Sequence, residues 1–340
     1  MTVRPTMIST PTATTETPVA RICEAIHARR RFLITSHARP DGDSIGSQLA
    51  MLFALEALGK EVHVVNADPA PEHYMDFPGM DRIEISRTVH SDVEALIVME
   101  CSDLARTNVQ GLGGRFTINI DHHAGNTGFG ELTWFDESAA ACGEMVFTLI
   151  RALGVPLTKE IATHIYLAIL TDTGSFHHSH ITPRTFEICR QTVEAGVNPA
   201  AMARRVFDSN SFGKLKLIGA VLDEMELLDG GRLAALYLND EILNATGTTY
   251  NDTEGLINLP LTAREIQAVV FFKLGADGDI RVSMRSKYDV DVRSVASGYG
   301  GGGHKNAAGF TAKGPLDKVK PEILARVKDA IEAGIQTRPG

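Results

Sequence analysis

Three short apolar runs of this chain, residues 32–35, 95–99 and 116–120, each stop just before an acidic or histidine motif. The motifs are His37-Ala-Arg-Pro-Asp41-Gly-Asp43, Glu100-Cys-Ser-Asp103 and Asp121-His122-His123. Apolar runs of this length are typical of buried strands. In open α/β sheets, ligands bind beyond the carboxyl ends of the strands, so the arrangement predicts that all three motifs share one edge of a sheet.

Helical segments separate these strands and predict the class of the fold. Apolar residues recur at helical spacing from Ser44 to Leu58 and stop before Gly59. A further strand is expected over residues 61–65. A helix over residues 159–170 would deliver a fourth motif, Thr171-Asp172-Thr173-Gly174, to the same edge. Strands that alternate with helices predict a doubly wound, mostly parallel α/β sheet.

The pattern then changes, and the 340 residues predict two domains. Residues 1–17, rich in Thr and Pro, predict a disordered tail ahead of a catalytic domain over residues 18–182. Residues 183–228 predict a helical connector, and residues 229–340 a smaller α/β domain. That domain is expected to contain strands over 233–238, 268–274 and 280–284 and a helix over 316–333. We expect the active site in the cleft between the two domains.

Charge and cysteine content exclude several classes of protein. The chain has 33 Lys and Arg against 42 Asp and Glu, and it lacks the basic stripe that usually grips long duplex nucleic acid. No apolar stretch reaches the about 18 residues that a membrane-spanning helix needs, so we expect no membrane association. The four cysteines are widely spaced, which fits a reducing, cytoplasmic setting better than a disulfide framework or a structural zinc site.

The motifs supply imidazole and carboxylate groups that suit divalent metal ions. His37 and Asp41 can face one ion while Asp43 faces its neighbour. Taken alone, this motif also fits a solvated turn that caps a helix, and Asp172 alone fits an ordinary helix end. Two adjacent histidines behind Asp121 at the end of a strand are harder to explain by packing. Together the four motifs predict a paired-metal site, and such sites most often cleave phosphate esters.

Two segments of the second domain complete the set of motifs: Arg285-Ser286-Lys287, and Gly300-Gly-Gly-Gly-His304-Lys-Asn-Ala-Ala-Gly309. With His37 to Gly46, Asp121-His122-His123 and Thr171 to Phe176, they make the chain resemble the DHH phosphoesterase superfamily with a C-terminal DHHA1 domain. More narrowly, it resembles the nano-RNase and pAp-phosphatase branch. The resemblance runs from about residue 18 to about residue 335. Its most specific element is the glycine run, which separates this branch from relatives with a different second domain.

The resemblance implies a division of metal ligands. His37 and Asp41 would hold one ion, Asp43, His122 and Asp172 would hold the other, and Glu100 would bridge both. The family has Asp at the bridging position, so Glu100 departs from its pattern by one methylene. The usual metal of the family is manganese, and the mixed imidazole and carboxylate ligands also admit Fe²⁺, Co²⁺ or Zn²⁺.

The implied chemistry is attack on phosphorus by a water that two metal ions share and acidify. His123 would contact the substrate phosphate and stabilise the charge that develops on it. Asp41, or a second water, would manage the protons.

The second domain would select the substrate. Backbone N–H groups of Gly301, Gly302 and Gly303 can approach a phosphate and form an anion nest. Arg285 and His304 offer further donors, and Ser286 lies within the same matching motif. A phosphate site in the second domain and one at the metals would together select a short ligand with phosphates at both ends.

The resemblance therefore implies a phosphoesterase that converts oligoribonucleotides of two to five nucleotides to mononucleotides and 3′-phosphoadenosine 5′-phosphate (pAp) to AMP. Three alternatives stay open: a phosphodiesterase for cyclic di-AMP or pApA, an inorganic pyrophosphatase of the DHH type, and a nucleotide sensor without catalysis. Short RNA or DNA oligonucleotides are the expected partners, and a homodimer is compatible with the family.

Overall fold

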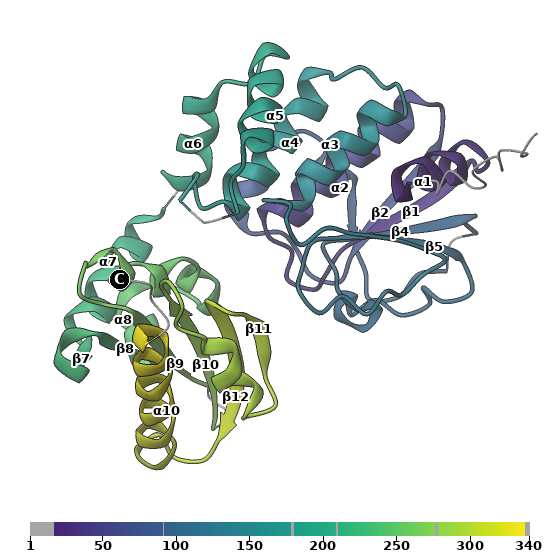
Figure 1. Ribbon diagram of the computed structural model, residues 1–340. Helices are drawn as coiled ribbons and strands as arrows, with labels where there is room; N and C mark the ends of the chain where they lie inside the picture. The colour runs from purple at the N-terminus through teal and green to yellow at the C-terminus, as the bar shows by residue number, and fades with distance from the viewer. Residues whose placement is uncertain (1–16, 91, 178–179, 209, 276–277, 337–340) are drawn as a thin grey trace, which may run out of the picture. The chain divides into compact units, whose positions relative to one another are not determined.

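The computed structural model describes residues 17–336 except 91, 178–179, 209 and 276–277 (Figure 1). The chain divides into two compact units, residues 1–208 and 209–340, which are described separately below. Residues 1–16, most of the segment for which we expect a disordered tail, lie outside the described residues.

Six parallel strands form the sheet of the first unit, in the order β3-β2-β1-β4-β5-β6. The strands are β1 (Arg31–Thr35), β2 (Glu61–Asn66), β3 (Ile83–Ile85), β4 (Ala95–Met99), β5 (Phe116–Asp121) and β6 (Leu132–Phe135). The predicted α/β fold with a parallel sheet is confirmed. The chain builds outward from β1 to β3 and then returns to place β4 beside β1. The order reverses between these two strands, and crevices of this kind are where α/β sheets bind ligands.

Helices cover one face of this sheet and loops cover the other (Figure 1). The helices of the first unit are α1 (Pro18–His27), α2 (Gly42–Ala57), α3 (Cys142–Ala152), α4 (Lys159–Asp172), α5 (Pro183–Glu194) and α6 (Pro199–Phe207). The main core lies beneath α2, α3 and α4. A smaller core, which includes Leu33, Leu96 and Val98, lies beneath the loops.

Small residues let α2 and α4 approach each other closely. A Cβ atom at Gly42 would lie 2.5 Å from the Thr171 side chain, and one at Gly46 would lie 2.5 Å from the His164 carbonyl oxygen. Neither distance is sterically allowed, so glycine is required at both positions. The contact joins the first turn of α2, which carries Asp43, to the last turn of α4, which carries Asp172.

The buried His164 of α4 predicts that acid destabilises the protein. Burial lowers the pKa of His164 from 6.5 to about 4, although a bond to the Pro78 carbonyl oxygen opposes the shift. Between these values the unfolded chain binds a proton that the folded chain excludes, so stability falls as the pH drops from 6.5 to about 4. The loss should reach about 3 kcal/mol, because each pKa unit is worth about 1.4 kcal/mol.

Urea unfolding with chelator present, at several pH values, tests this expectation. The variant His164→Gln keeps a donor for the Pro78 carbonyl oxygen but does not titrate. Its free energy of unfolding should fall less between pH 6.5 and 4 than that of the parent chain. Equal losses in both proteins would show that His164 does not carry the effect.

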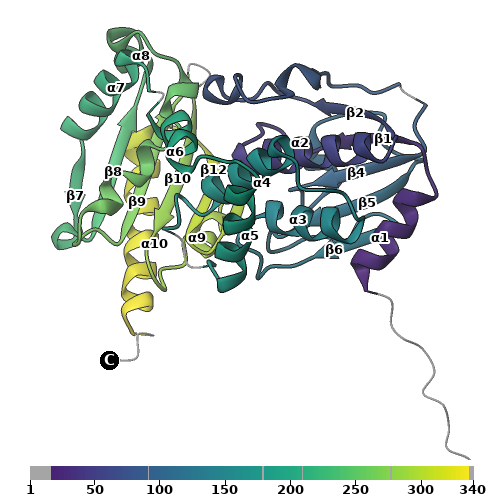
Figure 2. The same ribbon diagram turned by 90° about the horizontal axis from the view of Figure 1, so that it is seen from above.

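The second unit contains a six-stranded sheet in the order β11-β12-β10-β9-β8-β7, in which only β8 and β9 are parallel. Its strands are β7 (Glu226–Leu228), β8 (Leu233–Leu238), β9 (Ala268–Leu274), β10 (Asp279–Ser286), β11 (Gly302–His304) and β12 (Ala307–Lys313). Helices α7 (Phe212–Asp223) and α8 (Asp240–Thr246) pack on one face. Helices α9 (Val292–Ser297) and α10 (Leu316–Gln336) pack on the other (Figure 2).

The predicted connector, residues 183–228, is divided between the two units. Helices α5 and α6 contact elements of the first unit, and α7 contacts elements of the second. The boundary falls between Asp208 and Ser209.

Two global properties can be read from the described residues. None of the helices within them is both long and apolar enough to cross a membrane. The four cysteines are all free thiols.

Candidate metal centre

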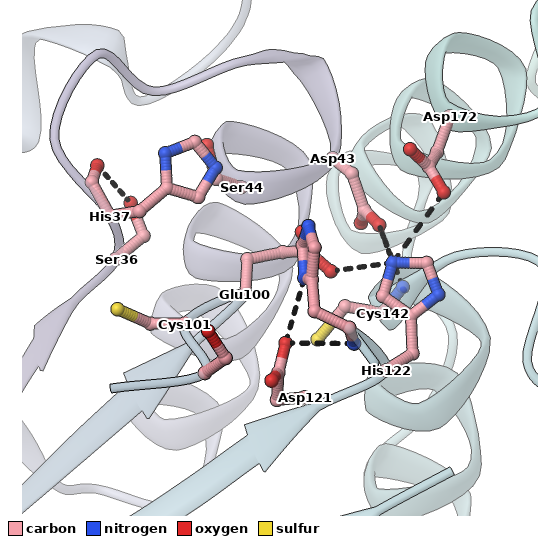
Figure 3. Close-up of polar contacts among 12 residues, drawn as sticks. Ser36, His37, Asp43, Ser44, Glu100, Cys101, Asp121, His122, Cys142 and Asp172 are labelled. Carbon is pink, nitrogen blue, oxygen red and sulfur yellow. Dashed lines mark hydrogen bonds and ion pairs between the residues drawn. The ribbon is translucent and has the colours of Figure 1, made fainter. Parts of the chain in front are cut away.

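Five of the predicted site residues converge at the carboxyl edge of the parallel sheet (Figure 3). Asp43 lies in the first turn of α2, and Glu100 follows β4 directly. His122 and His123 follow β5, and Asp172 is the last residue of α4. Residues separated by more than a hundred positions in the chain therefore share one small volume.

His122 lies at the centre of this group. Its Nε2 atom lies 3.0 Å from Glu100 Oε1, 3.5 Å from Asp172 Oδ2 and 3.9 Å from Asp43 Oδ2 (Figure 3). The other ring nitrogen, Nδ1, lies 3.0 Å from the Ala139 carbonyl oxygen. A carbonyl only accepts, so Nδ1 carries the hydrogen, and this bond presents Nε2 to the carboxylates in the manner of metal-binding histidines.

Asp43 is held by the start of α3. Its carboxylate accepts hydrogen bonds from the backbone N–H groups of Cys142 at 2.7 Å and Gly143 at 3.1 Å, and from the Ser47 hydroxyl at 2.9 Å. Backbone N–H groups at a helix N-terminus favour a negative charge. The side chain is only 1% exposed, so these bonds allow a charged group to be buried and fix its orientation.

Glu100 adopts a backbone conformation that its residue type rarely accepts. Its φ angle is +56°, in the left-handed region, while its N–H still donates to the Ile120 carbonyl oxygen of β5. Such strain costs of order 1–3 kcal/mol and tends to occur at functional sites. The side chain is 1% exposed, and its Oε1 atom faces His122 Nε2 at 3.0 Å. A buried carboxylate oxygen in this state has the environment of a metal ligand.

The electrostatics of the group also suit cations. Burial and then the charge of Asp43 raise the pKa of Glu100 well above its usual value. Partial burial and Asp43 likewise raise the pKa of Asp172 to about 7. Burial opposes protonation of His122, yet the charges of Glu100, Asp172 and Asp43 raise its pKa to about 11. Three carboxylates around one imidazole leave an excess of negative charge that divalent cations would neutralise.

Two sets of potential ligand atoms share His122. Atoms of Asp43, His122 and Asp172 lie within 4.8 Å of one another, and so do atoms of Glu100, His122 and His123. Imidazole and carboxylate donors suit Mn²⁺, Fe²⁺, Co²⁺ or Zn²⁺. The residues present therefore fit divalent metal ions.

His37 and Asp41, which we expect to hold the first ion, lie beside this group. His37 Nε2 lies 3.7 Å from Asp41 Oδ2, and the His37 and His123 rings are 6.4 Å apart between centroids. Asp41 also caps α2 by accepting from the Ser44 N–H at 3.0 Å. The position of Asp41 thus fits both interpretations of the motif, as a helix cap and as a metal ligand, since one oxygen caps the helix while the other faces His37.

His123 is oriented by Asp121, a residue of the predicted motif to which we assigned no role of its own. His123 Nδ1 donates to Asp121 Oδ1 at 2.9 Å and lies 3.3 Å from Glu100 Oε2. Asp121 is fully buried, and its other oxygen accepts from the Asn126 amide at 2.6 Å. The Asp of the Asp-His-His motif therefore positions the histidine that we expect to contact phosphate.

Arg285 and Ser286 lie at the end of β10 in the second unit. Arg285 is half-buried and donates to the Met284 carbonyl oxygen at 3.0 Å, and burial lowers its pKa. No carboxylate within the described part of the chain forms an ion pair with it, so it has the character of an anion site. The Ser286 hydroxyl donates to the Val290 carbonyl oxygen at 2.7 Å and accepts from Asn306. The role of Ser286 in substrate binding stays a prediction. To donate to a substrate, its hydroxyl would have to give up the hydrogen bond to the Val290 carbonyl oxygen.

The glycine run is more ordered than an anion nest in an open loop. Gly302 to His304 form the edge strand β11, paired with β12. A Cβ atom at Gly301 would clash with the Gly309 carbonyl oxygen, and one at Gly303 with the Ala307 carbonyl oxygen. Close packing between the two strands thus explains glycine at both positions. Gly302 and His304 are exposed, so this edge is open to a ligand.

Comparison with known proteins gives two matching families. The DHH family, N-terminal domain, matches residues 31–169, and the DHHA1 domain matches residues 230–333. The bifunctional oligoribonuclease and PAP phosphatase NrnA of Thermus thermophilus is 33% identical over 315 residues, which cover 92% of this chain and 93% of that protein. The corresponding protein of Bacillus subtilis is 27% identical, with 82% of this chain and 88% of the relative covered.

Solved structures share the fold. An exopolyphosphatase-related protein from Bacteroides fragilis matches with a TM-score of 0.84 and 25% identity, covering 93% of this chain and 96% of that one. RecJ from Thermus thermophilus, solved in complex with Mn²⁺, matches with a TM-score of 0.52 and 14% identity, covering 93% of this chain and 54% of RecJ.

Proposed function

We propose that this chain, which belongs to the DHH family and carries a DHHA1 domain, hydrolyses short oligoribonucleotides to mononucleotides and pAp to AMP. It is a phosphoric ester hydrolase, and the finer choice of substrate is the proposal. The relatives named as oligoribonuclease and PAP phosphatase align over most of the chain, which supports this choice. The observation that carries it is the convergence of Asp43, Glu100, His122 and Asp172 at the sheet edge.

Two divalent cations, which we take to be Mn²⁺, would be held by His37, Asp41, Asp43, Glu100, His122 and Asp172. When bound, such ions supply a water molecule of lowered pKa and neutralise phosphate charge. His123, whose Nδ1 hydrogen is held by Asp121, would donate from Nε2 to a phosphoryl oxygen in its doubly protonated form. Asp41, whose side chain is 48% exposed, would accept the proton that the attacking water loses and return it to solvent.

The second unit would recognise a terminal phosphate through Arg285, His304 and the glycine edge. Replacing Arg285 with Met should raise the KM for pAp roughly 10–100-fold, because a hydrogen bond to a charged group is worth about 1.5–3 kcal/mol. The KM for the unphosphorylated dinucleotide ApA should change much less. Arg281→Met, on the exposed part of the same strand, is the matched control. Equal effects on pAp and ApA would contradict the assignment of Arg285.

A substrate panel tests the proposed function. The full chain is stripped with chelator, reloaded with Mn²⁺ and supplied separately with pApA, pAp, cyclic di-AMP, pyrophosphate and a long RNA. We expect release of AMP from pApA and pAp, and little turnover of pyrophosphate or long RNA. Preferred cleavage of pyrophosphate, or tight pAp binding without turnover, would replace the proposal by the pyrophosphatase or the sensor. Preference for cyclic di-AMP would replace it by the cyclic dinucleotide phosphodiesterase.

A further inference from the structure

An exposed aromatic side chain packs against the turn that follows Asp172. Phe186 of α5 is 56% exposed. One face of its ring stacks on Phe176, with centroids 5.6 Å apart and planes inclined by 19°. Phe176 in turn meets Tyr166 of α4 edge to face at 6.5 Å. The three rings form an aromatic ladder that runs from the core to the surface.

The backbone that carries Phe176 connects the ladder to the metal centre. Phe176 lies four residues after Asp172, and its N–H donates to the Thr173 hydroxyl at 3.0 Å. Ser175 and Phe176 both have positive φ angles, +59° and +65°, which non-glycine residues rarely adopt. The chain thus accepts strain at two consecutive residues, and this sharp turn sets Phe176 against Phe186 instead of letting α4 continue.

The outer end of the ladder borders a surface cavity of about 580 Å³. Ile181, Thr182, Pro183, Phe186, Glu187 and Arg190 line it. It is shallow and open to solvent, and the apolar side chains Ile181, Pro183 and Phe186 dominate its lining. A flat apolar ligand can therefore bury one face against Phe186.

The charges around the cavity indicate which part of a nucleotide it fits. Arg190 Nη2 lies 2.7 Å from Glu187 Oε1, and the same guanidinium also pairs with Glu194. Two carboxylates around one guanidinium leave no positive charge to attract a phosphate. An uncharged aromatic base meets no such penalty, and bases stack on exposed aromatic side chains without sequence preference.

We propose that Phe186 and the cavity beside it form a nucleobase subsite, in which a base of the substrate stacks on the face of the Phe186 ring that does not contact Phe176. This inference rests on the proposed function for the identity of its ligand. It adds a base contact within the first unit, separate from the phosphate contacts expected of the second. It also gives the enzyme a reason to favour nucleotides over other small phosphate esters.

Ligand-observed NMR tests the subsite without requiring turnover. The protons of the full chain, kept in chelator, are saturated, and the transfer of this saturation to the protons of adenosine, which has no phosphate, is recorded. We expect strong transfer to the adenine protons, loss of it in Phe186→Ala and retention in Phe186→Trp. Phe207→Ala, which removes another exposed phenylalanine of the first unit, should leave it unchanged. Equal transfer in the parent chain and Phe186→Ala would overturn the proposal.

Kinetics then separate the subsite from the proposed function. In the Mn²⁺-loaded protein, Phe186→Ala should raise the KM for ApA roughly 5–100-fold, the usual contribution of one stacked base. A dinucleotide with one abasic position should lose this dependence, and kcat should change little. If nothing is hydrolysed while adenosine still binds through Phe186, the proposed function fails and the subsite stands. If the parent chain and Phe186→Ala hydrolyse ApA with equal KM, the subsite fails. It also fails if sedimentation shows that Phe186→Ala acts only by dissociating a dimer.

Discussion

Replacing His122 with alanine will sharply reduce hydrolysis and metal binding together. His122 Nε2 lies among the oxygens of Glu100, Asp172 and Asp43, so its removal deletes one metal ligand and the group around which the three carboxylates are arranged. Metal ions contribute several kcal/mol to phosphoryl transfer, and each 1.4 kcal/mol is tenfold in rate. We therefore expect kcat/KM for pAp to fall by roughly 10³-fold or more. Elemental analysis of the purified variant should show that it binds less than the full complement of metal.

A matched variant separates this effect from a general loss of structure. His63→Ala removes an exposed histidine from β2 of the same sheet and should keep full activity and metal content. Circular dichroism should show that His122→Ala stays folded, because the bonds between Asp43 and the start of α3 do not involve the imidazole. A His122→Ala protein that keeps its metal and loses less than tenfold in activity would refute the assigned centre.

The substitution Glu100→Gln will have effects of opposite sign on activity and on stability. It keeps the shape of the side chain but removes a charge that the chain buries at 1% exposure beside Asp43. In chelated protein we expect the free energy of unfolding to rise by about 1–3 kcal/mol, since burial and the neighbouring Asp43 disfavour the charged carboxylate that the amide replaces. With Mn²⁺ present, we expect activity to fall roughly 100-fold, because a neutral amide is a poor ligand for a hard cation.

Denaturant unfolding with and without Mn²⁺ measures one half of this expectation, and pAp turnover measures the other. Glu137→Gln, at an exposed position of the first unit, should change neither. Glu100→Asp should remain active, because it restores the family residue and Asp adopts positive φ more readily than Glu. A Glu100→Gln protein as active as the parent would show that Glu100 is not a ligand. One that is less stable in chelator would show that the ion pair with His122 outweighs the cost of burying the carboxylate.

Most of the first sheet was predictable because its central strands are continuous apolar runs. The expected strands over 32–35, 61–65, 95–99 and 116–120 match β1, β2, β4 and β5 to within one residue at each end. The edge strands β3 and β6 were missed, because they are short and carry partly exposed residues. Edge strands depend on a neighbour for pairing, and a neighbour leaves no local signal.

The same distinction applies to the site. Asp43, Glu100, His122 and Asp172 could be gathered from the sequence because each follows or begins an element that reaches the sheet edge. The groups that orient these side chains could not be predicted from the sequence. The Ala139 carbonyl and the Cys142 N–H are backbone groups that every residue except proline carries. The strain at Glu100 also has no signature in the residue type. In the second unit, the glycine run was expected to form a nest, and its pairing with Ala307 to Gly309 became evident only from the register.

The close contact of α2 with α4 makes the spacing of two carboxylates depend on two glycines. A side chain at Gly42 or Gly46 would meet Thr171 or the His164 carbonyl oxygen and force the helices apart. Asp43 and Asp172 lie at the ends of these helices, so they would separate as well. The sequence can therefore lose the metal centre through a substitution at a residue that carries no ligand atom.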